Sequence, residues 1–272
     1  MLTLLFLTAL STAPVRLATY EYPAFDRRAA LGPLAREIEA ELSRPVEIVL
    51  FATPDALGSA LRRGEVELAV TNLAAYAQSA TNDRVTAIAV LDVPAETLDG
   101  YRGVLLARRD AGIETPAALR ARAASLRYAE VLPGSTSGAL VQAGHLAAVQ
   151  LQPDSFGVRT QAGTHEKVLA SLLAGDTDLG AMAEAPWRAL LRTKPDTAAL
   201  LTELWRSPPL PPGPVVCVRS RSLPCDRIAR RLLRTATAAP MLARGWAETS
   251  GALRFIRPDP RRYRVFLRPA GR

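Results

Sequence analysis

The chain has 272 residues, of which 49% are hydrophobic and 22% are charged. This composition is typical of a globular protein and excludes a disordered chain, and the length is sufficient for one large domain or two lobes with separate cores. The formal net charge is +8 and comes almost entirely from arginine, with much of the excess after Arg219. Because no nucleic-acid-binding motif accompanies this charge, we expect a solvated arginine-rich surface and no nucleic-acid partner.

The first residues, Met1 to Leu10, form a short apolar run that is followed by the small residues Ser11, Thr12 and Ala13. This pattern predicts a signal peptide over residues 1–13 and therefore an exported, periplasmic protein. Pro14 disfavours cleavage directly after Ala13, and no Lys or Arg precedes the run. An upstream start, an uncleaved segment that keeps the protein at the membrane, or a first buried element are the alternatives. No second apolar run is long enough to span a membrane.

The next part of the chain alternates between predicted strands and helices. Strands are expected at 15–20, 46–51 and 68–71, and helices at 31–42, 53–64 and 73–80. Such alternation predicts an α/β fold with a parallel sheet.

The middle of the chain repeats this pattern, with strands at 126–131 and 179–183 and helices at 139–149 and 164–173. A helix that ends at glycine, two acidic residues and a buried strand occur at both 61–69 and 172–180, which favours two similar lobes. The stretch 207–214 is rich in proline and suits a segment crossing between lobes. A partner crossing is expected between 99 and 107. Helices at 226–238 and 240–248 are then expected to pack on the first lobe.

The most informative segment is the loop Gly134–Gly138, which follows a strand and precedes a helix. The first N–H groups of a helix have no internal partner, and together with the helix dipole they favour an anion. The hydroxyls of Ser135, Thr136 and Ser137 add donors, and Gly138 allows close approach of the backbone. No lysine follows in P-loop register, so the loop does not resemble a nucleotide-binding loop. An ordinary helix cap is the competing interpretation.

A second helix start lies at Thr164, a suitable N-cap, which places His165 where a ring N–H can donate to an oxyanion. A bound dianion would favour the protonated imidazole, whereas the helix N-terminus opposes it. Ligands of open α/β sheets bind beyond the carboxyl ends of strands, a rule that adds Tyr22, Asn72 and Glu184 to the candidates. Tyr76 lies one turn into the helix after Asn72 and could reach the same cleft.

These segments together resemble the phosphate-, phosphite- and phosphonate-binding proteins of ABC importers. The resemblance rests on Ser135–Gly138, Gly163–Glu166 and Gly175–Asp178, with further matches at Gly64–Ala69, Tyr76, Tyr101–Val104 and Pro211–Pro214. It implies a two-lobed type II periplasmic-binding fold, in which each lobe is a mostly parallel sheet flanked by helices and two strands cross between them. The expected division is 14–102 for the first part of lobe 1, 103–210 for lobe 2, and 211–272 for the return to lobe 1.

The resemblance also implies the function and the site. It predicts a non-enzymatic, monomeric solute-binding protein that captures a small oxyanion and delivers it to an ABC permease, with no cofactor and no metal. It implies that Ser135, Thr136, Ser137 and His165 hold the oxyanion, that Tyr76 and Tyr101 line the cleft, and that Glu184 can meet a ligand amine. The chain departs from the family near Pro54 and Asp55, where an aromatic residue is missing, and at Thr71–Leu73.

Two other functions fit parts of the sequence. A ligand-sensing lobe for a membrane sensor kinase would use the same fold. An α/β hydrolase would use Thr136 as nucleophile, but that fold places its histidine late in the chain, and His165 is the last one here. The two cysteines, Cys217 and Cys225, fit either a short disulfide-closed loop or two thiols.

Overall fold

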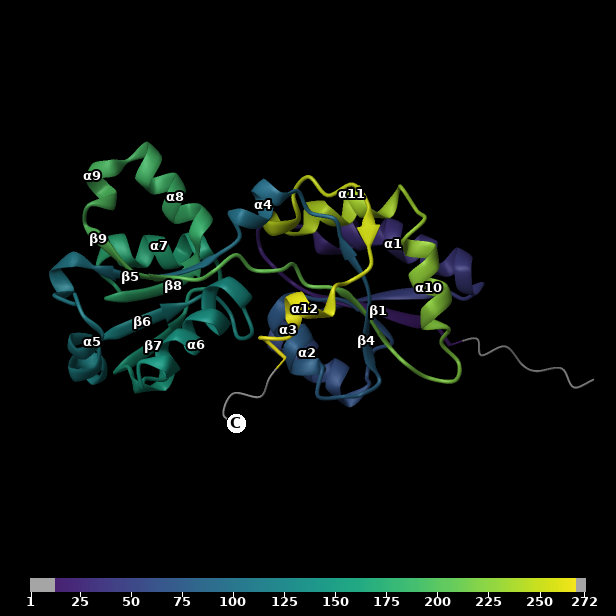
Figure 1. Cartoon of the computed structure of the whole chain (residues 1–272), viewed down its shortest axis with the longest axis horizontal. Coiled ribbons are helices and arrows are strands. Elements are labelled where there is room, and N and C mark those ends of the chain that lie inside the picture. Colours follow the sequence, from purple (N-terminus) through teal and green to yellow (C-terminus); the bar gives the residue numbers. More distant parts are fainter. Residues whose placement is uncertain (1–12, 268–272) are drawn as a thin grey trace, which may run out of the picture.

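The computed structural model describes residues 13–267 and contains two lobes, each built around one sheet (Figure 1). Except for Ala13, the predicted signal peptide lies outside the described residues. Within residues 13–267 no helix combines the length and the apolar character that a membrane span needs.

Lobe 1 holds a six-stranded sheet with the order β11-β4-β10-β3-β1-β2. Its first part comprises β1 (Val15–Tyr20), α1 (Arg27–Leu42), β2 (Val46–Phe51), α2 (Pro54–Arg63), β3 (Leu68–Val70), α3 (Leu73–Ser79), β4 (Val85–Leu91) and α4 (Ala95–Asp99). The end of the chain returns to it with β10 (Val215–Val218), α10 (Cys225–Leu232), α11 (Ala238–Leu242), β11 (Phe255–Ile256) and α12 (Pro260–Tyr263).

Lobe 2 holds a five-stranded sheet with the order β7-β6-β8-β5-β9. Its elements are β5 (Gly103–Arg108), α5 (Pro116–Arg122), β6 (Arg127–Glu130), α6 (Val141–Ala148), β7 (Val158–Gln161), α7 (His165–Ala174), β8 (Leu179–Ala183), α8 (Glu184–Thr193), α9 (Pro195–Ala198) and β9 (Leu201–Arg206). Residues 92–102 and 207–214 connect the two sheets.

The two sheets share one construction. In each, three strands run parallel, β2-β1-β3 in lobe 1 and β7-β6-β8 in lobe 2. The strands next to the connecting segments run antiparallel to their neighbours: β10 pairs with β3 and β4, and β5 pairs with β8 and β9. The predicted parallel arrangement therefore describes the centre of each lobe, and the crossing strands make both sheets mixed.

Helices cover both faces of each sheet. In lobe 1, buried residues of α1, α10 and α11 pack on one face, and residues of α2 and α3 pack on the other. In lobe 2, α5 and α6 contribute to one cluster, and α7, α8 and α9 contribute to the second. The carboxyl ends of the parallel strands thus point toward the gap between the lobes, where the loops that follow them meet.

Several predicted helix boundaries differ from the structure, and the helix predicted at 226–238 already ends at Leu232. The helix α1 begins at Arg27 rather than at residue 31, because the carboxylate of Asp26 caps it by accepting from Ala29 N. The helical chain in lobe 2 already begins at Thr136, as a π-helical turn that continues into α6. The helix predicted at 240–248 is wrong: α11 ends at Leu242, and a separate turn spans Ala247–Thr249.

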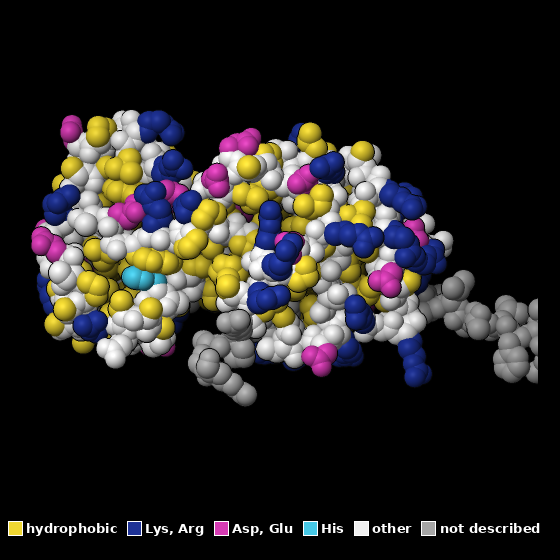
Figure 2. All heavy atoms as spheres, in the orientation of Figure 1, with side chains coloured by type: hydrophobic (Ala, Val, Ile, Leu, Met, Phe, Trp, Pro, Cys, Tyr) yellow, Lys and Arg dark blue, Asp and Glu magenta, His cyan; other side chains and the backbone are white. Residues whose placement is uncertain are grey.

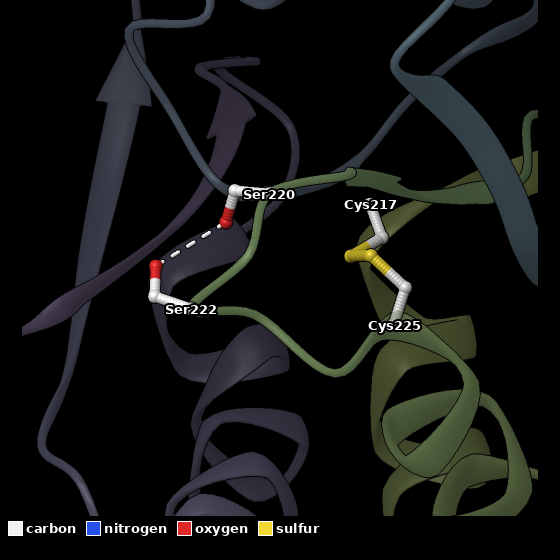
Figure 3. Close-up of a disulfide and its surroundings, with 4 residues drawn as sticks. All are labelled: Cys217, Ser220, Ser222 and Cys225. Carbon is white, nitrogen blue, oxygen red and sulfur yellow. Dashed lines mark hydrogen bonds between the residues drawn. A yellow bond between two sulfur atoms is a disulfide. The ribbon is translucent and has the colours of Figure 1, made fainter.

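The two cysteines form a disulfide between β10 and the start of α10 (Figure 3). Their Cα atoms are 5.9 Å apart, and both residues are buried in the lobe 1 core. The hairpin between them carries a hydrogen bond between the hydroxyls of Ser220 and Ser222. The disulfide therefore fastens the return strand to the first of the C-terminal helices.

The arginine-rich part of the chain forms a mixed charged surface on lobe 1. Figure 2 shows Lys and Arg side chains spread over this lobe, with acidic side chains among them. On α10, Arg227 pairs with Glu41 and Arg231 pairs with Glu37, both acids belonging to α1. Part of the positive charge thus joins α10 to α1, as exposed or half-buried ion pairs.

Candidate functional site

A small cavity of about 110 Å³ lies between the lobes. Its polar lining comes from both lobes and from the first connection: Tyr20, Tyr22, Arg27, Asn72, Tyr101, Ser135, Thr136, Ser137, His165, Glu166 and Glu248. The residues that bracket it on lobe 2 follow β6 and start α7, as the strand-end rule predicts.

The Ser-Thr-Ser loop is fixed from behind. The side-chain amide of Gln142 is fully buried. Its Nε2 donates to the backbone carbonyls of Ser137, Val104 and Met182, at 2.8, 3.0 and 3.2 Å. The backbone N–H of Ser135 donates to the carbonyl of Leu132. The N–H groups that follow it begin the helical turn and have no earlier carbonyl to pair with. The loop therefore offers helix-start N–H groups and three hydroxyls to the cavity, held by a polar contact that the sequence did not reveal.

His165 is a neutral donor at this site. It is the first residue of α7, behind the N-cap Thr164, and its Nδ1 accepts a 2.9 Å hydrogen bond from the amide of Ala183. Because Nδ1 is the acceptor, the ring proton resides on Nε2. Burial lowers the pKa of His165 to about 4. The imidazole therefore serves as a hydrogen-bond donor without charge at neutral pH, and the protonated form considered for a bound dianion is disfavoured.

Gly138 leaves the space that the imidazole occupies. A Cβ at this position would meet Val131 Cγ2 at 2.4 Å and His165 Cε1 at 3.1 Å. Any side chain here would push against the histidine or the strand that precedes the loop. Gly138 is not in the cavity wall itself, and its role in the site is to let His165 approach the Ser-Thr-Ser loop.

Arg27 supplies the positive charge of the cavity. The residue is 4% exposed, and its guanidinium stacks on Tyr20 at 4.0 Å and on Trp246 at 4.5 Å. Its Nε donates to the carbonyl of Gly245, and Nη1 donates to the carbonyl of Tyr20. Arg27 forms no salt bridge with any acid in the described range 13–267. A buried guanidinium that lacks a carboxylate partner has spare N–H donors and favours an anion in the cavity.

The aromatic hydroxyls in the wall are neutral donors as well. Burial raises the pKa of Tyr22 to about 12 and raises the pKa of Tyr101 well above its usual value. Tyr101 lines the cavity together with Thr136 and Ser137 of lobe 2 and with Glu248 of lobe 1.

The lobes are in contact around the cavity. The amide of Asp55 donates to the carbonyl of Pro133 at 3.2 Å, and Asn72 Nδ2 donates to the carbonyl of Gly134 at 2.8 Å. Gly134 has φ 77°, and a Cβ here would lie 2.6 Å from the amide of Asp55. The hydroxyl of Thr136 accepts from the amide of Ala74 at 3.2 Å. These contacts border the cavity on the side of α2 and α3. The hydroxyl of Thr136 takes part in one of them, which disfavours its use as the nucleophile of a hydrolase.

The structure brings seven of the predicted site residues to the cavity wall: Tyr22, Asn72, Tyr101, Ser135, Thr136, Ser137 and His165. Thr164 and Gly138 support it, as cap and as spacer. Their part in holding a ligand stays a prediction. Arg27 and Glu248 were missed: the first fell just before the predicted helix, and the second fell in a wrongly predicted one.

Glu184 and Tyr76 neither line the cavity nor support its wall. Glu184 is buried at the start of α8, where its carboxylate lies 2.7 Å from Arg206 and within 4 Å of Arg102 and Arg188. The ion pairs with these three arginines give Glu184 a structural role. Tyr76 packs edge-on against the ring of Tyr263, with the ring centroids 5.3 Å apart, and so faces the C-terminal segment. Within the described part of the chain no group of three or more acids, histidines and cysteines is arranged to hold a metal ion.

Comparison with known proteins identifies relatives of this fold. A family model described as the periplasmic substrate-binding protein of a phosphonate ABC transporter matches residues 22–263. PhnD1 from Prochlorococcus marinus, solved in complex with methylphosphonate, is 17% identical, with 92% of this chain and 94% of that chain covered and a TM-score of 0.63. A binding-protein component of an ABC phosphonate transporter from Pseudomonas aeruginosa is 20% identical, with coverages of 93% and 83% and a TM-score of 0.64.

The protein XAC2383 from Xanthomonas citri, solved with ATP bound, is also 20% identical; the coverages are 94% and 96%, and the TM-score is 0.70. At these identities the likeness establishes the two-lobed type II periplasmic-binding fold. No protein with a curated description matches the chain significantly.

Proposed function

Because the chain belongs to the family of periplasmic substrate-binding proteins of phosphonate ABC transporters, we propose that it captures a small oxyanion in the cavity between its lobes. The ligand class is a phosphonate, phosphite or phosphate-like ion. The protein would act outside the cytoplasm as a monomer and present its closed form to an ABC permease. Closure of two lobes around a ligand is the hinge motion typical of this architecture.

One observation carries the proposal: a buried arginine that forms no salt bridge lies across the cavity from a loop of helix-start N–H groups and hydroxyls. Arg27 belongs to lobe 1, and Ser135 to Ser137 belong to lobe 2. An anion between them would receive charge-assisted hydrogen bonds from both sides, which are stronger than bonds between neutral groups. The ligand would thereby hold the lobes together.

The volume limits the size of the ligand. A cavity of about 110 Å³ accommodates a tetrahedral ion with a small substituent and excludes a nucleotide unless the lobes open. We therefore expect methylphosphonate and phosphite to fit the closed form. Ligands with longer organic groups would require displacement of the wall near Phe25 and Pro54, which also line the cavity.

A panel of ions tests the proposal. Thermal unfolding is measured with phosphate, phosphite, methylphosphonate, 2-aminoethylphosphonate and methanesulfonate, because a ligand that binds only the folded state raises the melting temperature. We expect at least one phosphorus oxyanion to stabilise the protein in a saturable way. If none of these ions does so, the proposed ligand class is wrong.

The variant Ser137→Ala locates the binding site. Loss of one hydroxyl donor to a charged ligand should weaken binding about tenfold. The matched control is Ser222→Ala, an exposed serine on the disulfide hairpin, which should bind like the wild type. Equal affinities of the two variants would place the ligand elsewhere.

A further inference from the structure

A carboxyl group lies in the wall of this proposed anion site. Glu248 belongs to the short turn Ala247–Thr249, which follows Trp246, and its side chain lines the same cavity as the Ser-Thr-Ser loop. An ionised carboxylate repels an anion in a confined space of low dielectric constant. The protonation state of Glu248 therefore affects which anions can bind.

The groups that line the cavity with Glu248 come from several other parts of the chain. Arg27 of α1 and Tyr20 of β1 lie on its own lobe, and Tyr101 lies just before β5. Across the cavity lie the neutral imidazole of His165 and the exposed carboxylate of Glu166, at the start of α7. Tyr22 completes the wall as a neutral phenol. Arg27 is thus the one permanent cation lining the cavity among the described residues.

The environment also holds a proton on Glu248 more readily than water does. Burial raises the pKa of this carboxyl, and the attraction of Arg27, which acts in the opposite direction, does not cancel the effect. Glu248 therefore takes up a proton more readily than an exposed glutamate does, and it can act as an acceptor or as a donor.

We propose that Glu248 shares one proton with an oxygen of the bound ligand and thereby selects phosphonate-type oxyanions over sulfonates. This inference rests on the proposed function and deepens it. A phosphonate monoanion brings its own proton as a P–OH group, which donates to the ionised carboxylate. A phosphonate dianion accepts the proton from the neutral carboxyl instead. Either route gives the same complex with one proton between the two oxygens, and no covalent bond to carbon, phosphorus or sulfur changes.

A sulfonate has no proton to bring. It can bind only when Glu248 is already protonated, so its binding requires a proton from the solvent whenever the free carboxyl is ionised. In that pH range the affinity for methanesulfonate should fall about tenfold for each unit of pH. The affinity for methylphosphonate should stay level until its own second proton dissociates, because no net proton is taken up.

Calorimetric titrations with methylphosphonate and methanesulfonate, from about pH 5 to about pH 8, test this linkage. Repeating each titration in two buffers of different ionisation enthalpy measures the protons taken up. We expect the ratio of the two affinities to widen with pH in the wild type. A ratio that does not change with pH would overturn the inference.

The variant Glu248→Gln removes the ionisable carboxyl but keeps its shape. Its amide no longer repels an anion and can donate to a sulfonate oxygen, so methanesulfonate should bind more tightly than in the wild type. The ratio of affinities should fall by about tenfold or more, and its dependence on pH should disappear. The matched control is Glu21→Gln, an exposed glutamate beside Tyr20 and Tyr22 that is outside the cavity wall, which should leave the ratio unchanged.

A second variant covers the case in which Glu248→Gln does not fold. Glu248→Asp keeps the carboxyl, so it should weaken both ligands and preserve the preference for methylphosphonate. If Glu248→Gln keeps the wild-type ratio, or if Glu248→Asp loses it, Glu248 does not select the ligand. If wild type binds neither ion nor any phosphorus oxyanion of the panel, the proposed function itself fails. Binding with an unchanged ratio refutes the inference alone.

Discussion

The two lobes contribute different chemistry to the cavity that they share. Lobe 2 contributes mainly neutral donors, namely the hydroxyls and N–H groups of Ser135 to Ser137 and the imidazole of His165, together with the exposed carboxylate of Glu166. Lobe 1 contributes charge, from Arg27 near the beginning of the chain and Glu248 near its end. Under the proposed function, one lobe would recognise the tetrahedral head of the ligand, and the other would recognise its charge and protonation.

This division teaches why closure can depend on the ligand. Each lobe alone offers an incomplete site: lobe 2 lacks a positive charge, and lobe 1 lacks the ring of donors. Few direct hydrogen bonds join the lobes, and one of them is that of Asn72 with the carbonyl of Gly134. An anion that bridges both lobes would add charge-assisted bonds that neither lobe can supply by itself.

The largest expected effect comes from removing the charge of lobe 1. Arg27→Met keeps an unbranched side chain against the rings of Tyr20 and Trp246 but leaves the cavity without a cation. We expect the affinity for methylphosphonate to fall about 100-fold or more, as for loss of one partner of a buried charged pair. Isothermal titration calorimetry measures the change.

The adjacent Arg28 provides the control for this variant. It is exposed and donates to the carbonyl of Ile48, so Arg28→Met should bind like the wild type. Because Arg27→Met also removes the hydrogen bonds to the carbonyls of Gly245 and Tyr20, the variant should be about 1–3 kcal/mol less stable, and its affinity is measured under conditions where it is folded. Wild-type affinity in Arg27→Met would show that lobe 1 does not supply the charge.

A smaller effect is expected from crowding the donors of lobe 2. In Gly138→Ala the new methyl group would lie 2.4 Å from Val131 Cγ2 and 3.1 Å from His165 Cε1, so the imidazole must shift. We expect about tenfold weaker binding and about 1–3 kcal/mol of destabilisation, measured by titration and by urea unfolding. In the control Gly144→Ala, on α6, the Cβ meets nothing within 4 Å, and both quantities should stay near the wild-type values. Unchanged binding by Gly138→Ala would mean that the position of His165 is unimportant.

The smallest effect on binding is expected from the titration of His165. Its pKa is lowered from 6.5 to about 4, so the unfolded chain binds a proton that the folded protein refuses between these values. The contribution of the neutral imidazole is complete above about pH 6.5 and is lost as the pH falls toward 4, with an upper limit of about 3 kcal/mol. The stability of wild type should decline over this range more steeply than that of His165→Asn. Above pH 6.5, no proton linkage from His165 should appear in ligand binding. Identical pH profiles of stability for the two proteins would contradict the buried neutral state.

The sequence predicted the lobe 2 half of the site far better than the lobe 1 half, and the reason is physical. Ser135 to Ser137 and His165 each begin a helix, and caps and glycines signal helix starts locally. Arg27 was missed because apolar periodicity placed the start of α1 at Leu31, although Asp26 is a suitable N-cap. Glu248 lines the cavity because the chain turns after Trp246, and no local sequence signal predicts this turn. The strand-end rule placed Glu184 at the gap because it follows a strand. The rule does not predict that three arginines form ion pairs with its carboxylate.

The alternation of strands and helices was predicted well for the parallel centre of each sheet. Crossing segments were expected, but the antiparallel pairing of β5 and β10 was not predicted, because their partners lie far away in sequence. The same holds for the disulfide, where the spacing of Cys217 and Cys225 permitted a bond but did not require it. Contacts between distant segments, and not local propensity, decide these features.

The central claim is that an oxyanion binds between the lobes, and a crystal structure of the protein grown with methylphosphonate tests it most directly. We predict a phosphonate group in the cavity, with oxygen atoms bonded to the loop of Ser135 to Ser137 on one side and to Arg27 on the other. A structure in which this cavity stays without the phosphonate while the ion binds at another surface would contradict the account.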